Sequence, residues 1–98
     1  MCNASVKGSA KVEMIEDSAR VRIVRYTLGP GDATGWHRHA LDYVIVPYED
    51  CRIRVDTAAG SIEAEMKCDQ PYFRQQGAEH DVVSLMDKPF SFLEIELK

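Results

Sequence analysis

Two histidines two residues apart, His37 and His39, are the residues of this 98-residue chain whose types and spacing most directly suggest chemistry. Side chains at positions i and i+2 of a strand point to one face, so both imidazoles would lie on the same side of a strand. The third histidine, His80, begins a second apolar run, His80–Leu85. If the two strands meet, three imidazoles converge, and neutral imidazole is a common metal ligand. The spacing therefore predicts one divalent transition metal held by His37, His39 and His80.

Such a site would suit catalysis, because three protein ligands leave coordination positions open. Water bound there would become more acidic. Neutral imidazoles do not compensate the charge of a divalent ion, so the site favours an anion such as a carboxylate. Nitrogen-rich sites accept iron, nickel, zinc, manganese or copper, and the sequence does not choose among them. On a regular strand Tyr43 shares the face of His37 and His39, whereas Asp42 points away. We therefore expect Tyr43 to face the site and to hydrogen-bond a water or an anionic substrate.

The composition excludes several classes of partner. The net charge of -4 comes without a basic stripe interleaved with aromatic residues, which argues against nucleic acid. No apolar stretch approaches the ~20 residues needed to cross a membrane, and the start of the chain lacks the apolar core of a signal peptide. The sequence thus predicts a cytoplasmic protein. Its length predicts one domain over residues 1–98, with residues 1–11 forming a flexible arm or an extra edge strand.

Short strands must position these residues, because no stretch shows sustained helical periodicity. Runs of β-branched and aromatic residues are separated by turn signals about every 8–12 residues, which predicts an all-β barrel or sandwich. The expected strands are Val12–Ile15, Val21–Leu28, a histidine strand that Pro47 ends, Cys51–Thr57, Ser61–Cys68, Tyr72–Arg74, His80–Leu85 and Phe90–Leu97. In the last strand three aliphatic residues alternate with Glu94 and Glu96.

The clearest hairpin joins Cys51–Thr57 to Ser61–Cys68 through a turn in which Gly60 can take a positive φ. Centring this turn on Ala59 and Gly60 gives one apolar and one charged face, with the pairs Val55–Ala64, Ile53–Met66, Thr57–Ile62, Arg54–Glu65 and Asp56–Glu63. The same register places Cys51 opposite Cys68, so a cross-strand disulfide is geometrically possible. In a reducing cytosol all three cysteines, Cys2 included, are instead expected to be free thiols, and their spacing is not that of metal ligands.

Two segments resemble the sequence motifs of the cupin family. The stretch Gly31–Tyr43 matches the spacing of the first motif, G-x5-H-x-H-x3-E-x6-G. Gly77 and His80 match the second motif, G-x5-P-x-G-x2-H-x3-N, within residues 69–84. The amino-acid sequence of residues 35–47 is similar to the sequences of the BauB subgroup of small single-domain cupins, which includes a β-alanine degradation protein.

The resemblance implies a single cupin jelly-roll β-barrel, a metal inside it and, often, a homodimer. His37, His39 and His80 carry over as ligands. Tyr43, however, stands where the motif has its glutamate ligand, so no carboxylate ligand carries over. The chain departs from the motifs at four other positions. Asp50 and Asp69 replace two motif glycines, Gln75 replaces the proline, and Ser84 replaces the asparagine.

The histidines and the resemblance favour a metal-dependent enzyme acting on a small organic acid or amino-acid derivative, with β-alanine-type catabolism implied by the resemblance. With iron it would be a non-haem oxidoreductase that takes substrate and O2 together, as three-histidine thiol dioxygenases do. The alternative is a non-catalytic module that binds or senses a small carboxylate, and a third possibility is a metal-free structural cupin; fold alone does not separate them. Trp36 is expected at the rim, and candidate carboxylate contacts are Arg25, Tyr26, Arg74 and Gln75.

Overall fold

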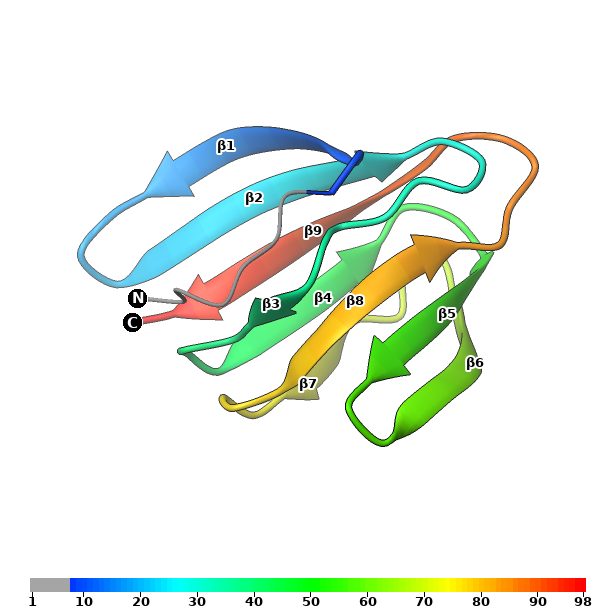
Figure 1. The fold of residues 1–98 in the computed structure, drawn as a ribbon. Coiled ribbons are helices and arrows are strands. Elements are labelled where there is room, and N and C mark those ends of the chain that lie inside the picture. The colour runs from blue at the N-terminus through cyan, green and yellow to red at the C-terminus, as the bar shows by residue number, and fades with distance from the viewer. Residues whose placement is uncertain (1–7) are drawn as a thin grey trace.

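Antiparallel strands build the described part of the chain, residues 8–98 of a computed structural model, and no helix occurs among these residues. The strands are β1 (Lys11–Asp17), β2 (Val21–Leu28), β3 (His37–Arg38), β4 (Tyr43–Pro47), β5 (Cys51–Thr57), β6 (Gly60–Met66), β7 (Tyr72–Arg74), β8 (Glu79–Ser84) and β9 (Phe90–Leu97). One sheet has the order β1-β2-β9-β4-β7 and the other the order β3-β8-β5-β6 (Figure 1). The all-β jelly roll expected from the sequence is confirmed.

The core lies between these two sheets because each sheet turns one face of alternating apolar residues inward. Phe90 and Phe92 of β9 pack in one buried cluster with Ile45 of β4 and, from the other sheet, Ile53 of β5. No helix in the described part of the chain is long and apolar enough to cross a membrane.

The last strand occupies the middle of its sheet. β9 pairs with β2 on one side and with β4 on the other, so the end of the chain lies against the middle of the barrel wall (Figure 1). Residue 94 of this strand pairs with Val24 on β2 and with Ile45 on β4, and both of these neighbours are buried. A side chain on the inner face of β9 therefore points into the core.

The prediction that one strand carries the paired histidines and continues to Pro47 is wrong. His37 belongs to β3 in the four-stranded sheet, whereas Tyr43 begins β4 in the five-stranded sheet, and the chain passes from one sheet to the other between them. Strand parity does not hold across such a crossing. Gly35, two residues before β3, has φ 91°, a conformation that favours glycine.

The register predicted for the β5–β6 hairpin is also wrong. Thr57 pairs with Gly60, so the turn is centred on Ala58 and Ala59, and every cross-strand partner moves by two residues. The Thr57 hydroxyl accepts a hydrogen bond from the Ala59 amide (3.2 Å) and donates one to the Gly60 carbonyl (2.9 Å), which stabilises the shorter turn. A shift of two residues preserves the faces, which is why the alternation pattern did not reveal it.

The corrected register separates the two cysteines of the hairpin. Cys51 is buried opposite Met66, while Cys68 is exposed beyond the end of β6, and both are free thiols. The Cys68 thiol donates to the Tyr48 carbonyl (3.2 Å), and its amide donates to Asp50 (2.8 Å).

Four predicted strands keep their bounds in the structure, while β1, β6 and β8 differ at their ends. β1 runs over Lys11–Asp17 instead of residues 12–15, β6 over Gly60–Met66 instead of 61–68, and β8 over Glu79–Ser84 instead of 80–85. The predicted arm over residues 1–11 lies mostly outside the described residues. Within its described part, the Ala10 amide donates to the Ala33 carbonyl (2.9 Å), and Lys11 opens β1.

Candidate metal centre

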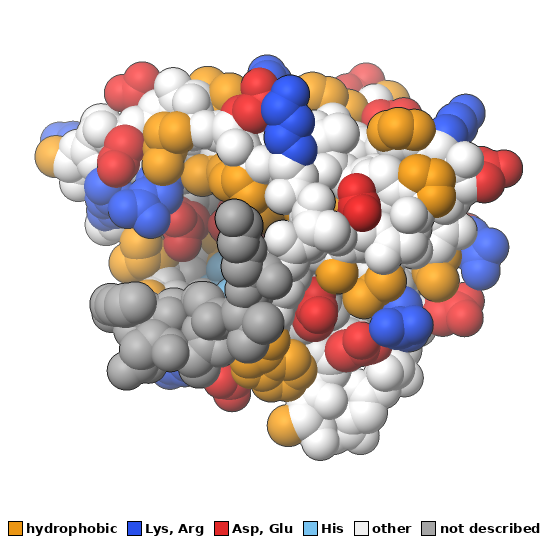
Figure 2. Space-filling model, turned by 45° about the horizontal axis from the view of Figure 1, so that its top comes forward, with side chains coloured by type: hydrophobic (Ala, Val, Ile, Leu, Met, Phe, Trp, Pro, Cys, Tyr) orange, Lys and Arg blue, Asp and Glu red, His pale blue; other side chains and the backbone are white. Residues whose placement is uncertain are grey.

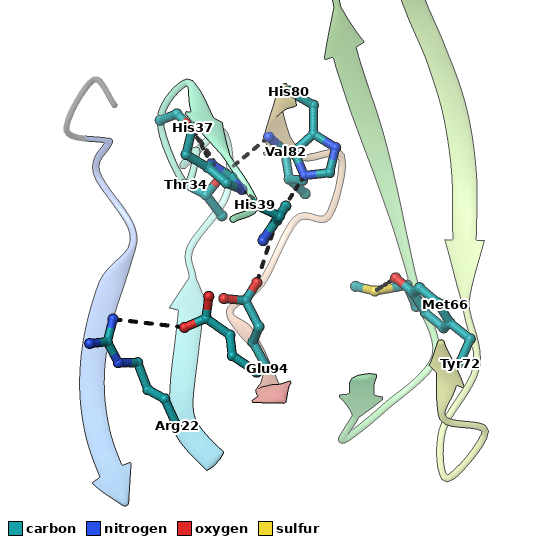
Figure 3. A network of polar contacts seen from close by, with 11 residues as sticks. Arg22, Thr34, His37, His39, Met66, Tyr72, His80, Val82 and Glu94 are labelled. Carbon is teal, nitrogen blue, oxygen red and sulfur yellow. Dashed lines mark hydrogen bonds and ion pairs between the residues drawn. The ribbon is translucent and has the colours of Figure 1, made fainter. Parts of the chain in front are cut away.

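Three imidazoles from distant parts of the chain meet at one point. His37 on β3 pairs directly with His80 on β8, and His39 follows β3 by one residue. The Nε2 atom of His39 lies 3.0 Å from Nε2 of His37 and 3.2 Å from Nε2 of His80 (Figure 3). The structure therefore brings together the three histidines that the sequence singled out, each turning the same nitrogen toward the others.

Backbone contacts hold the rings in place. The His39 amide donates to the Ala78 carbonyl (2.8 Å), and the His39 carbonyl accepts from the Gly77 amide (2.7 Å). Gly77 has φ 99°, which favours glycine and turns the loop back onto residue 39. The Gly35 amide donates to the Asp81 carboxylate (3.0 Å), tying the segment before β3 to β8. These bonds fix His39 even though it lies outside a strand.

The donor set fits a cation. Nδ1 of His37 lies 2.6 Å from the Gly35 carbonyl, which can only accept, so Nδ1 carries the proton and Nε2 presents a lone pair. Lone pairs crowded on one point repel unless a proton or a metal ion lies between them. Nitrogen ligands about 2.1 Å from a shared ion are about 3.0–3.4 Å apart, and the distances from Nε2 of His39 to the other two Nε2 atoms, 3.0 and 3.2 Å, fall in this range. His37, His39 and His80 form a group that could hold a metal ion.

Two of these imidazoles are held neutral. Burial lowers the pKa of His39 to about 3, and the neighbouring His37 and His80 lower it further in the same direction. Burial, with a contribution from His37, lowers the pKa of His80 to about 4. Both rings are therefore in the form that binds a metal at neutral pH.

Tyr43 lies beside the histidines. Its ring stacks on that of His39 at 3.9 Å between centroids and 22° between planes, and the residue is 3% exposed. Burial, with the Glu94 charge, raises the pKa of Tyr43 to about 12, so its hydroxyl stays a proton donor. Asp42 does point elsewhere, since its carboxylate accepts from the Gln76 amide (2.8 Å). Tyr43 thus has the position that parity gave it, although the strand assumed for that argument is broken.

The sequence analysis missed one acidic residue of this region. Glu94 on β9 is 7% exposed, and its Oε1 lies 3.8 Å from Nε2 of His39 (Figure 3). Burial, with the charge of Glu96, raises the pKa of Glu94 to about 8. The signal was present in the sequence, because Phe90 and Phe92 share the parity of Glu94 and an aromatic face of a strand turns inward.

The histidines line one end of a cavity of about 510 Å³. Its walls are largely apolar, with Ile45, Ile53 and Phe92 among them, and two cations, Lys67 and Arg74, also line it. Away from the histidines, the Tyr72 hydroxyl donates to Met66 Sδ at 3.3 Å (Figure 3). Arg74 lies over the Tyr72 ring at 4.5 Å. In Figure 2 a small area of pale blue histidine surface is visible in a recess of the outer surface.

Of the four candidate carboxylate contacts, two line the cavity. Tyr26 and Arg74 do so, whereas Gln75 is exposed outside it. Arg25 points away as well, because it pairs with Glu13 (3.6 Å) and donates to the Tyr48 hydroxyl (3.1 Å). The position of an arginine on the outer face of β2 could not be told from β2 alone, whose two faces look alike in sequence.

The sequence and the fold of this chain are similar to those of known proteins. A scan against models of protein families finds no match. The chain is 38% identical over 82 residues to the β-alanine degradation protein BauB of Pseudomonas aeruginosa, covering 84% of this chain and 86% of that protein. A cupin domain of Bordetella pertussis superposes with a TM-score of 0.90 at 35% identity, covering 95% of this chain and 97% of the other. The polyketide cyclase RemF of Streptomyces resistomycificus, at 16% identity and TM-score 0.72 over 99% of this chain and 72% of its own, shares the fold.

Proposed function

This chain belongs to the cupin family, in the group of small cupins that includes BauB, and on that premise we propose that it is a metal-dependent enzyme acting on a small organic acid or amino-acid derivative. One divalent transition metal would be held by His37, His39 and His80. The observation that carries the proposal is the approach of the His37 and His80 Nε2 atoms to that of His39, at 3.0 and 3.2 Å, in the lining of a largely apolar cavity.

The side chains around the histidines suit a small anion. Arg74 supplies positive charge for a carboxylate, whereas Lys67, the other cation of the lining, is paired with Glu65 at 3.5 Å. The largely apolar walls suit the carbon skeleton of a small organic molecule. Tyr43, whose pKa is raised to about 12, keeps its proton and can donate a hydrogen bond to a bound anion. The chemistry that a bound divalent ion supplies is activation of a carboxylate, water or O2 at the positions that the histidines leave free.

β-Alanine and related amino acids are the substrates to test first, because the Pseudomonas relative is named for β-alanine degradation. Such a molecule is small enough for a cavity of about 510 Å³ and carries a carboxylate that Arg74 of the lining would bind. Small thiols are the second group, since an iron form would take substrate and O2 together.

Metal analysis followed by activity measurement tests the proposal. Protein purified without a nickel column would be stripped with chelator and titrated with Co²⁺, Zn²⁺ and Fe²⁺. We expect one ion per chain in the wild type and in Gln75→Ala, an exposed control outside the cavity, and at least about a 100-fold loss of affinity in His39→Ala, because outer contacts alone cost about 10–100-fold. No binding by folded wild-type protein would refute the metal site.

O2 uptake and turnover of small carboxylates, amino acids and thiols then separate the two function classes. Uptake with one substrate that His39→Ala abolishes supports the enzyme. Saturable binding of a carboxylate without turnover by any metal form would instead identify the alternative, a carboxylate-binding or sensing module. Homodimer formation, cytoplasmic location and a single domain over the whole chain stay predictions from the sequence and the family resemblance.

A further inference from the structure

We propose that Glu94 is the carboxylate ligand of the metal at the three-histidine site, supplied by β9 in place of the motif glutamate that Tyr43 replaces. The inference rests on the proposed metal site and adds to it a fourth protein ligand. It concerns a residue outside both sequence motifs, on a strand that the motifs do not reach.

The first argument is burial without a partner. Glu94 is 7% exposed and lies between the buried side chains Val24 and Ile45 of the two neighbouring strands. Among residues 8–98, no hydrogen bond to its carboxylate is found, and the carboxylate forms one ion-pair contact, with Nε2 of His39 at 3.8 Å. A buried carboxylate in such surroundings is costly unless it meets a cation. The residue lines the cavity, so a cation bound at the histidines could reach it.

The second argument is direction. Figure 3 shows the Glu94 side chain rising from β9 toward His39, while His37 and His80 approach His39 from the other side. The donor atoms of His39 and Glu94 belong to one group whose members lie within 4.8 Å of one another. Ligands of one ion lie about 3.0–3.4 Å apart when each bond is about 2.1 Å. Glu94 is grouped with His39 and not with all three histidines, so ligation requires its side chain to move toward an ion that the histidines hold.

The third argument is charge. Three neutral imidazoles compensate none of the charge of a divalent ion, and in the motif a glutamate supplies one negative charge. Tyr43 cannot replace it at neutral pH, because a free phenol ionises only near pH ~10. Glu96, the other carboxylate near His39, already forms an ion pair with Arg22 at 3.8 Å. Glu94 is thus the carboxylate of this end of the cavity that has no other cation.

Metal affinity and the spectrum of bound Co²⁺ test the proposal. Metal-free wild type, Glu94→Gln and Glu96→Gln would each be titrated with Co²⁺ in competition with a chelator. We expect Glu94→Gln to bind at least about 100-fold more weakly, with visible absorption bands changed in position and intensity, because a direct ligand should matter more than an outer contact. Glu96→Gln removes the same charge two residues away and should change affinity by less than about threefold, with the spectrum unchanged.

The other outcomes separate this inference from the proposed function. Equal affinity of wild type and Glu94→Gln, equal losses in both glutamine variants, or a weaker Glu94→Gln with an unchanged Co²⁺ spectrum would each refute ligation by Glu94 and leave the histidine site standing. Wild-type protein that binds no Co²⁺ and no Zn²⁺ would overturn the metal site itself. Urea unfolding of the metal-free variants, in which Glu94→Gln should be at least as stable as wild type, shows that any loss is not misfolding.

Discussion

Replacing Glu94 by glutamine should make the metal-free protein more stable, and the gain should grow with pH. The substitution keeps the size of the side chain and removes only the ionisable group. Burial raises the pKa of Glu94 from 4.5 to about 8. Below pH 4.5 the carboxyl is protonated in both the folded and the unfolded chain, so the variant gains nothing there. Between pH 4.5 and 8 the unfolded chain releases this proton while the folded chain keeps it, and wild-type stability falls.

The size of the effect follows from the pKa values. Each pKa unit corresponds to about 1.4 kcal/mol, so the full loss approaches about 5 kcal/mol above pH 8, as an upper limit. Domains of this size are stable by only about 5–15 kcal/mol, so the metal-free wild type should be marginal at alkaline pH. The lowered pKa values of His39 and His80 act in the opposite direction, costing stability as pH falls below 6.5. Both histidines remain in the variant, so their effect cancels in the difference.

Urea unfolding at pH 5, 6, 7 and 8 measures the difference, with the fluorescence of Trp36, the single tryptophan, as the signal. The free energy of unfolding of Glu94→Gln minus that of wild type should rise by several kcal/mol from pH 5 to pH 8. Saturating Zn²⁺ should remove the alkaline loss in wild type, because a bound cation compensates the carboxylate. A difference that stays constant within about 0.5 kcal/mol over this range would refute the assignment of Glu94 as a buried, partnerless carboxyl.

Three further outcomes follow from the same structure. Zn²⁺ binding at pH 6.5 should release one proton more per ion in wild type than in Glu94→Gln. The reason is that the pKa of Glu94 is raised to about 8, so its carboxyl is protonated before the ion binds, while the pKa of His39 is lowered to about 3, so its ring has no proton to release. Calorimetry in buffers of different ionisation enthalpy measures the number of protons released, and equal release by the two proteins would contradict the prediction. Tyr43→Phe keeps the ring stacked on His39 and should change metal affinity less than threefold. Anion binding should weaken about tenfold, which is the effect of losing one hydrogen bond. Unchanged anion binding would exclude the Tyr43 hydroxyl as a donor to the anion. Phe90→Ala should lower the free energy of unfolding by about 3–5 kcal/mol, because Phe90 is 1% exposed. Phe73 is 50% exposed, so Phe73→Ala should lower it by less than about 1 kcal/mol. Similar losses for the two variants in urea unfolding would count against the described core.

Much of the fold could be predicted because it depends on local pattern. The strands Val21–Leu28, Cys51–Thr57, Tyr72–Arg74 and Phe90–Leu97 have the bounds that β-branched and aromatic runs between turn residues predict. The spacing of His37, His39 and His80 resembled the cupin motifs, and the structure brings these three rings together. Turn details were less predictable. The β5–β6 turn is centred one residue earlier than predicted, and this shift leaves the same side chains on each face of the hairpin. The Cys51–Cys68 pairing therefore looked as plausible from the sequence as the observed Cys51–Met66 pairing.

What the sequence by itself determined is therefore the all-β class, the bounds of four strands and the three histidines, since these follow from side-chain type and spacing along the chain. The tertiary structure decided which face of each strand points inward. Alternation on β9 shows that Leu93 and Glu94 point to opposite sides, with aliphatic residues sharing the parity of Leu93 and aromatic residues that of Glu94, so the sequence holds signals for both faces. The pairing of β9 with the buried Val24 and Ile45 decides that Glu94 takes the inner side. The physical reason is that burial belongs to the packed sheets and not to a strand, so a carboxylate that looks solvent-exposed in sequence lies beside His39 in the core.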